Sequence, residues 1–160
     1  MRLHCVVGGM GVVVLAFAVA NARTSAAQDM NQEKDAVLTL LDGRVSQFLD
    51  SVSAGQTQTA FKELLADSQL AKQADAVKEL VARTNDLEIK YGRCQGFEQV
   101  FAKRIGNDLV LMRYLYKCEN LPVAWYFTFY RTPTPGALTK NGAWRVVALR
   151  FDTKLEALAQ

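Results

Sequence analysis

A change of residue composition near Tyr91 sets the limits on how this chain can fold. Residues 31–90 contain no proline and only two glycines, and they are rich in alanine, leucine, glutamine and charged residues. Residues 91–151 hold both tryptophans and all five tyrosines, interleaved with β-branched and polar residues. Helix formers therefore dominate the first stretch and strand formers the second. This order predicts an α+β domain in which helices precede an antiparallel sheet.

Three amphipathic helices are predicted in the first stretch. The first is indicated by apolar residues at helical spacing, which are Val37, Leu41, Val45, Phe48 and Val52. It ends near Gly55, and Thr57 or Thr59 can cap a shorter second helix. A third helix begins near Ser68. Such apolar stripes are more typical of a core than of a partner-binding groove.

Four strands are predicted in the second stretch, at residues 93–105, 109–118, 123–131 and 144–151. Turns at 106–108 and 119–122 and a longer loop at 132–142 separate them, and residues 152–160 form a short closing helix. We expect three helices packed on one face of a curved antiparallel sheet of four or more strands. Residues 28–160 would form this single domain.

Residues 1–27 have the layout of a secretory signal peptide. Arg2 supplies an early positive charge, residues 6–20 are apolar, and small residues precede an expected cleavage after Ala27, with Ala22 as the second choice. An uncleaved N-terminal anchor is the alternative. The expected location is secreted or periplasmic, and after cleavage no segment would span a membrane.

After that cleavage the chain would contain no histidine, since His4 is the only one. This excludes histidine-based nucleophile pairs, histidine-containing zinc sites and a histidine pH switch. Two cysteines cannot form a structural zinc site by themselves. We therefore predict no metal, no cofactor and no assigned catalytic residue.

The two remaining cysteines are expected to face each other. If the first two strands fold about the turn at 106–108, Cys94 lies opposite Cys118. A disulfide can bridge such a pair, and export favours its formation. Two buried free thiols or a redox-active pair are the alternatives.

The same register predicts which side chains share a sheet face. The face expected under the helices carries Phe97, Phe101, Leu111, Leu115, Val123, Trp125, Phe127, Phe129, Val146 and Ala148. Gln99, Arg113 and Arg150 would lie on it too, near Trp125 and Phe127. These five residues are the candidate site for a small anionic ligand. Alternatively, the arginines pair with helix acids or reach solvent at the sheet edge.

The opposite face is expected to carry Glu98, Met112, Tyr114, Tyr116, Tyr126, Tyr130, Leu149 and Phe151. Glu98 would lie opposite Tyr114, as an acid–base device or, more commonly, as part of a surface hydrogen-bond ladder. Basic residues exceed acidic ones after Tyr91, whereas acidic residues are in excess before it. This asymmetry could favour an anionic ligand, although lysine and arginine also protect sheet edges. The sequence lacks a cluster of basic residues of the kind that indicates nucleic-acid binding.

Three helices followed by a long meander that ends in AWRVVALRFD, residues 143–152, resemble the cone-shaped NTF2-like superfamily. The resemblance covers residues 31–151 at the level of layout, and it extends to small exported bacterial proteins of that fold with no assigned activity. The resemblance implies a pocket between the sheet and the helices. It leaves the function open, because members of that superfamily range from isomerases and dehydratases to binding and assembly modules. Enzymes of that group often carry a pocket Asp-His pair or a single Asp.

The absence of histidine after cleavage favours an exported, non-catalytic protein that binds a small anionic or apolar ligand or has an accessory role. Two alternatives remain open. One is a metal-free isomerase or lyase with Glu98 or a helix carboxylate as base and a tyrosine as electrophile. The other is an assembly module that forms a homodimer through its sheet.

Overall fold

The computed structural model describes residues 21–132 and 143–158. The apolar run of the expected signal peptide and most of the 132–142 loop lie outside these residues. The chain divides into two units, Met1–Glu33 and Lys34–Gln160. In the first unit, residues 21–33 are helical. The second unit contains the rest of that helix, the other helices and the whole sheet. Among the described residues, no helix has the length and apolar character needed to cross a membrane.

The helices form in the stretch where apolar periodicity predicts them, except that the first begins at Asn21, before residue 31 and within the expected signal peptide. They are α1 (Asn21–Ser53), α2 (Thr57–Leu64) and α3 (Ala74–Tyr91). The third predicted helix is split, because a 3₁₀ turn, η1 (Gln69–Lys72), precedes α3. Ser68 caps that turn by accepting a hydrogen bond from the Leu70 amide at 3.0 Å, and its hydroxyl also donates to the Val146 carbonyl. The predicted threonine cap of α2 is wrong, since Gln56 occupies the N-cap position and makes no side-chain bond there.

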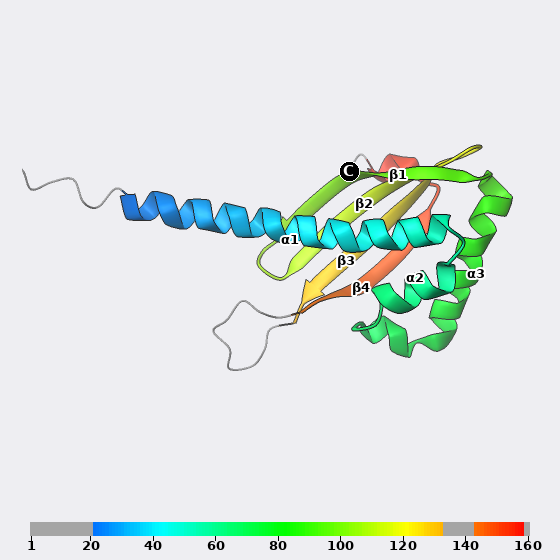
Figure 1. The fold of residues 1–160 in the computed structure, drawn as a ribbon, viewed down its shortest axis with the longest axis horizontal. Helices are drawn as coiled ribbons and strands as arrows, with labels where there is room; N and C mark the ends of the chain where they lie inside the picture. The colour runs from blue at the N-terminus through cyan, green and yellow to red at the C-terminus, as the bar shows by residue number, and fades with distance from the viewer. Residues whose placement is uncertain (1–20, 133–142, 159–160) are drawn as a thin grey trace, which may run out of the picture. The chain divides into compact units, whose positions relative to one another are not determined.

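Four strands follow and form one antiparallel sheet in the order β1-β2-β3-β4 (Figure 1). Their bounds are β1 (Cys94–Ile105), β2 (Leu109–Cys118), β3 (Val123–Arg131) and β4 (Trp144–Asp152). A 3₁₀ turn, η2 (Leu155–Leu158), follows β4, as expected for a short helical element there. The expected α+β architecture, with helices before the sheet, is confirmed.

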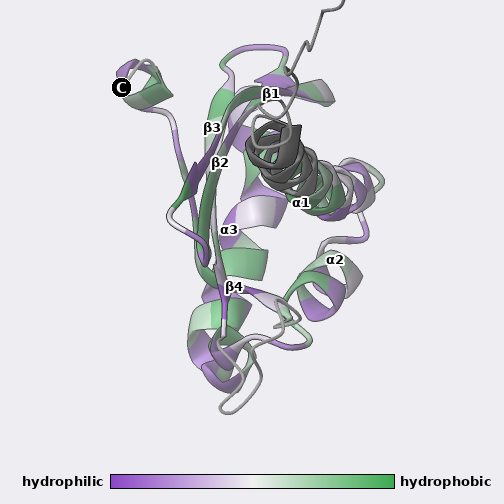
Figure 2. Ribbon diagram, turned by 90° about the vertical axis from the view of Figure 1, so that its left-hand side faces the viewer, coloured by the Kyte–Doolittle hydropathy of each residue, from purple (hydrophilic) through white to green (hydrophobic). Residues whose placement is uncertain are grey.

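Helices α1 and α2 lie on one face of the sheet, and η2 lies on the other (Figure 2). Seen along the sheet, α1 and α2 lie on one side, and the short helix beside the C label lies on the other (Figure 2). We call the side under α1 and α2 the inner face and the side under η2 the outer face. The inner face is tightly packed: Phe48 of α1 is buried against Trp125 and Phe127 of β3, and Phe61 of α2 packs on Phe48.

Register shifts decide which residues reach the inner face. In β1 the pairing moves from Cys94↔Cys118 to Phe97↔Tyr116, and it moves again between Gln99 and Phe101. In β4 a further shift skips Val147 in the pairing with β3, so this residue interrupts the alternation of side chains between the two faces. Because successive side chains in a strand point to opposite faces, each extra residue moves all later residues of that strand to the other face.

Candidate functional site

The five predicted ligand-binding residues do not come together. Trp125, Phe127 and Gln99 belong to the inner face, whereas Arg113 and Arg150 belong to the outer face. Arg113 pairs with Tyr126, because β2 and β3 pair with Tyr114 opposite Trp125, and this register places Arg113 on the other face of the sheet from Trp125. The shift in β4 does the same to Arg150. The predicted pocket of arginines beside Trp125 and Phe127 is therefore wrong.

The predicted face assignments of β2 and of parts of β1 and β4 are wrong as well. Residues expected inside that lie on the outer face are Phe101, Leu111, Arg113, Leu115, Ala148 and Arg150. Residues expected outside that lie on the inner face are Met112, Tyr114, Tyr116, Leu149 and Phe151. Met112, Tyr114 and Tyr116 are each at most 2% exposed, as expected for the face that the helices cover. The face assignments of β3 are confirmed, because Trp125 and Phe127 pack against Phe48 of α1.

Trp125 and Phe127 belong to the hydrophobic core. Trp125 is fully buried and Phe127 is 1% exposed. The ring of Phe48 meets both of them edge-on, with centroids 5.4 Å and 5.8 Å away. Such contacts stabilise the packing of α1 on the sheet, so these two rings contribute to stability.

A polar cluster joins α1 to the inner face at β1 and β2. The Tyr114 hydroxyl donates to Asp42 Oδ1 at 2.7 Å, and Gln99 Nε2 donates to the same oxygen at 2.9 Å. Gln99 Nε2 also lies 3.0 Å from the Tyr114 hydroxyl. One carboxylate oxygen of Asp42 thus accepts hydrogen bonds from the Tyr114 hydroxyl and from the Gln99 side-chain amide. Because Tyr114 is otherwise surrounded by core side chains, this bond satisfies its hydroxyl and fixes the helix on the sheet.

Burial and the neighbouring carboxylate together raise the pKa of Tyr114 well above its ordinary value. Desolvation is the largest cause, and the hydrogen bond to Asp42 adds to it, since both favour the protonated phenol. A pKa that is raised on folding stabilises the folded state fully below the unfolded pKa of about 10, and this stabilisation is lost as the pH rises above that value.

We expect Tyr114 to stay protonated at pH 11 while the protein is folded. In an absorbance titration at 295 nm, Tyr114→Phe should leave the amplitude between pH 9 and 11 unchanged and reduce only the amplitude that appears on alkaline unfolding. The free energy of unfolding should fall as the pH rises above about 10. A reduced amplitude below pH 11 in the variant would show that Tyr114 ionises in the folded protein and is not buried as described.

Glu98 is not a partner of Tyr114. It pairs with Leu115 in the ladder and forms a 2.7 Å ion pair with Lys117 on the outer face. The hydrogen bond and charge of Lys117 lower the pKa of Glu98 below its ordinary value, which keeps it ionised. An exposed, ion-paired carboxylate of low pKa is poorly suited to act as a general base at neutral pH.

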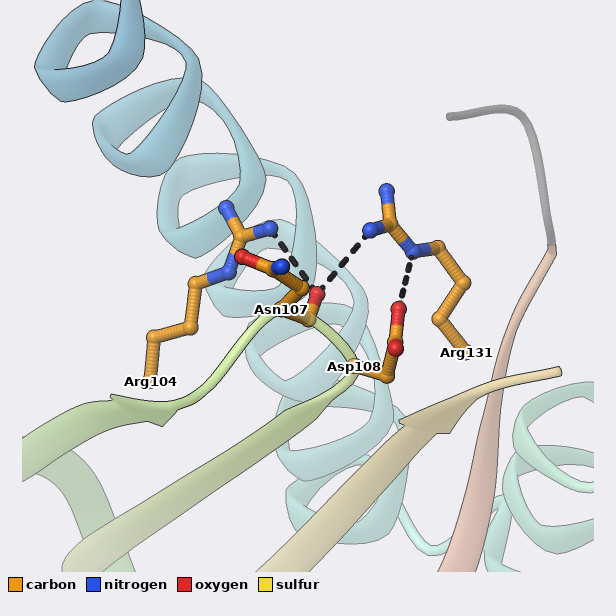
Figure 3. Close-up of polar contacts among 4 residues, drawn as sticks. All are labelled: Arg104, Asn107, Asp108 and Arg131. Carbon is orange, nitrogen blue, oxygen red and sulfur yellow. Dashed lines mark hydrogen bonds and ion pairs between the residues drawn. The ribbon is translucent and has the colours of Figure 1, made fainter. Parts of the chain in front are cut away.

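The β1–β2 turn carries a second polar cluster. Arg104 and Arg131 both donate to the carbonyl oxygen of Asn107, at 2.8 Å and 3.0 Å, and Arg131 Nε lies 2.9 Å from Asp108 Oδ1 (Figure 3). Both guanidinium groups also lie within 6 Å of the Trp144 ring centroid, at 5.9 Å and 5.4 Å. Since Arg131 is buried, this cluster ties the turn to the ends of β3 and β4.

One cleft of the structure has a volume of about 220 Å³. It lies between α3 and the adjoining ends of β3 and β4. Leu87, Val123 and Phe151, all less than 9% exposed, supply its apolar wall. Its cationic groups are Arg83, whose guanidinium lies 5.1 Å from the Phe151 ring centroid, and Lys90.

Three further residues complete the polar side of this cleft. Tyr91 and Thr153 supply hydroxyl groups, and Asp152 supplies a carboxylate. The Asp152 oxygens already accept hydrogen bonds from Arg150 at 3.3 Å and from the Lys154 amide at 2.9 Å. Lys90 pairs with Asp86 at 3.5 Å, but both side chains are at least half exposed, so this pair is weak and easily exchanged.

Sequence reasoning missed Arg83, Lys90 and Tyr91 as candidate ligand contacts. A signal for two of them exists, because Arg83, Leu87 and Lys90 stand at positions i, i+4 and i+7, on one helix face. Their proximity to Phe151 has no counterpart in the sequence pattern. It arises only when α3 packs beside the ends of β3 and β4.

The predicted pairing of the cysteines is found in the structure. Cys94 and Cys118 are partners in the β1–β2 ladder, and their sulfur atoms lie at disulfide distance. A small cleft of about 70 Å³ lies beside Cys94 and includes Ser53 and Tyr116. The hydroxyl groups of these two residues are 2.8 Å apart and hydrogen-bond to each other.

The fold and these sites define a class: an α+β protein whose open, four-stranded antiparallel sheet is covered by helices on one face. Comparison of the chain with family models, curated proteins and solved structures finds no match.

Proposed function

We propose that this protein is an exported, non-catalytic binding protein for a small organic anion, and that the 220 Å³ cleft between α3 and the ends of β3 and β4 is the binding site. The observation that carries the proposal is that one cleft combines two cationic side chains, Arg83 and Lys90, with a buried apolar wall. A few polar groups converging on an apolar surface are typical of small-ligand sites.

The shape and charge of the cleft favour a particular kind of ligand. Its volume is below the roughly 300–1,000 Å³ of sites for drug-sized molecules, so the ligand is small. The apolar wall accommodates a short apolar or aromatic body, and the two cations accommodate an acidic group. The one carboxylate in the cleft, Asp152, is partly neutralised by Arg150.

A binding role fits the chemistry of the carboxylates better than an acid–base role. Asp42 is engaged by two donors, and Glu98 is held in an ion pair with Lys117. In the bond between Asp42 and Tyr114 the phenol donates to the carboxylate, which leaves no proton directed at a substrate. The isomerase or lyase alternative would require both groups to change partners first.

Benzoate is a suitable probe, since it combines an aromatic body with a carboxylate. We expect calorimetry to show benzoate binding, with benzamide, its neutral analogue, at least about tenfold weaker, a difference of about 1.4 kcal/mol. Arg83→Met and Lys90→Met should each weaken benzoate binding by about 3- to 10-fold at low salt, because each removes one partly screened charge contact.

Lys78→Met is the matched control, because Lys78 is an exposed lysine on the same helix and does not line the cleft. It should leave the affinity for benzoate unchanged. Equal effects of Lys78→Met and Lys90→Met, or equal affinities for benzoate and benzamide, would contradict an anion site in this cleft.

A further inference from the structure

A row of four side chains crosses the outer face of the sheet, one from each strand. The ladder pairs Phe101 with Arg113, Arg113 with Tyr126, and Tyr126 with Arg150. Neighbouring strands lie about 4.8 Å apart, so the two arginines flank Tyr126 on either side. We call the three of these residues that can donate hydrogen bonds, which are Arg113, Tyr126 and Arg150, the outer-face row.

Aromatic rings hold both guanidinium groups in place. The Arg150 guanidinium lies 4.1 Å from the ring centroid of Tyr126, and that of Arg113 lies 4.5 Å from that of Phe101. Stacking engages the flat face of a guanidinium and leaves its N–H groups free to bind acceptors in the plane. The row therefore presents two oriented sets of donors.

Tyr126 adds a third donor that lacks an acceptor. The residue is only 9% exposed, and its hydroxyl group is buried without a hydrogen-bond partner in the part of the chain that the structure describes. A buried hydroxyl without a partner costs free energy that one acceptor would recover. An oxyanion placed between the two arginines would supply that acceptor.

The chain itself occupies part of this position. Arg113 Nη1 donates to the Ala157 carbonyl of η2 at 3.0 Å, and η2 lies on the outer side of the sheet (Figure 2). The acidic groups nearby are Asp152, which pairs with Arg150 at 3.3 Å, and Glu156 on η2 itself. A 3₁₀ turn of four residues with no buried residue is held weakly, so its carbonyl is an exchangeable partner for Arg113.

We propose that the outer-face row is a binding site for the oxyanion of a small molecule, a phosphate or carboxylate group, which takes the place of the Ala157 carbonyl on Arg113. Arg113 and Arg150 donate to its oxygens, and the Tyr126 hydroxyl donates a third hydrogen bond. Binding displaces η2 from the sheet and removes Glu156 from the site. This proposal does not depend on the cleft beside α3.

Inorganic phosphate and acetate are the probes, titrated into the full-length mature protein at constant ionic strength and followed by two-dimensional NMR. We expect phosphate to shift the Nε–Hε signals of Arg113 and Arg150 together with the backbone amides of η2. Acetate should shift the same signals if a carboxylate suffices, and phosphate alone should do so if a dianion is required. The absence of shifts with both probes would overturn the proposal.

Variants of the row separate site binding from general charge effects. Arg113→Ala, Arg150→Ala and Tyr126→Phe should each weaken phosphate binding at least fivefold. Arg145→Ala is the matched control. Arg145 lies on the outer face of β4 opposite Tyr130, outside the row, and its substitution removes the same charge. An equal loss in Arg145→Ala would show that phosphate responds to net charge only and would overturn the proposal.

Two readouts distinguish loss of the row site from a folding defect and from binding of the anion at the cleft. Tyr126→Phe removes only an unpartnered hydroxyl, so its melting temperature should not fall below that of the parent protein. Lys90→Met should bind phosphate at the row as the parent does, whatever its effect on benzoate. Loss of phosphate binding in Lys90→Met with retention in the row variants would place the anion at the cleft and refute the row.

Discussion

Replacing Phe127 with alanine is expected to destabilise the protein by about 3–5 kcal/mol, the cost typical of truncating a buried aromatic ring. Phe127 is 1% exposed, and its ring packs against Phe48, Tyr114 and Trp125, with centroids 5.7–6.0 Å away. The substitution removes these contacts and leaves a cavity between α1 and the sheet. Urea unfolding at neutral pH, with the free energy extrapolated to water, measures the loss.

Tyr130→Ala is the control for this experiment. Tyr130 is on the same strand but on the outer face, where it is 37% exposed, so its truncation should cost about 1 kcal/mol or less. The contrast tests the inner face directly. A cost below about 1 kcal/mol for Phe127→Ala would mean that this face is loosely packed, and a ligand pocket lined by Trp125 and Phe127 would again be credible.

Loss of the bond between Cys94 and Cys118 has the second largest expected effect. The two residues are 24 positions apart, and a cross-link that closes a loop of this size stabilises a protein by about 2–4 kcal/mol, mainly by restricting the unfolded chain. We expect Cys94→Ser/Cys118→Ser to lower the free energy of unfolding by this amount. The β1–β2 ladder should persist, because eight further residue pairs hold it together.

The parent protein treated with a reductant is the matched comparison. It should unfold at the same urea concentration as the double variant, and its mass should rise by two hydrogens on reduction. Identical unfolding of the parent protein with and without reductant, with no mass change, would show that the two thiols are free in solution. The single variants are less informative, because each leaves one unpaired thiol that can form intermolecular bonds.

The sequence predicted the elements well because their signals are local. Apolar spacing placed α1 and α2, and turn residues placed the strand ends within one residue of those observed. Gly92 is a further local signal. It adopts φ +79° at the end of α3, where a Cβ atom would approach that of Glu119 to 2.9 Å, so a glycine is required at this bend. The cysteine pairing also succeeded, because the two register shifts between the turn and this pair add up to two residues, which leaves Cys94 opposite Cys118 on the same face.

The faces of the sheet were not predictable in the same way. A register shift adds one residue and depends on how β1 and β4 twist against their neighbours, which no alternation pattern records. Arg150 was expected beside Trp125 but lies beside Tyr126 for this reason, whereas Arg113 lies beside Tyr126 because β2 and β3 pair one residue away from the expected register. Tyr114 was expected outside but is buried against Asp42, a residue 72 positions away.

The sequence by itself determined the α+β class, the order of helices before strands, the bounds of the sheet and the cysteine pair. Each of these depends on residue propensity and short-range periodicity, which act over a few neighbouring residues. Only the tertiary structure decided which residues form the cleft beside α3 and which form the outer-face row. Those assemblies depend on register shifts and on packing between segments distant in the chain, where one extra residue reverses the result.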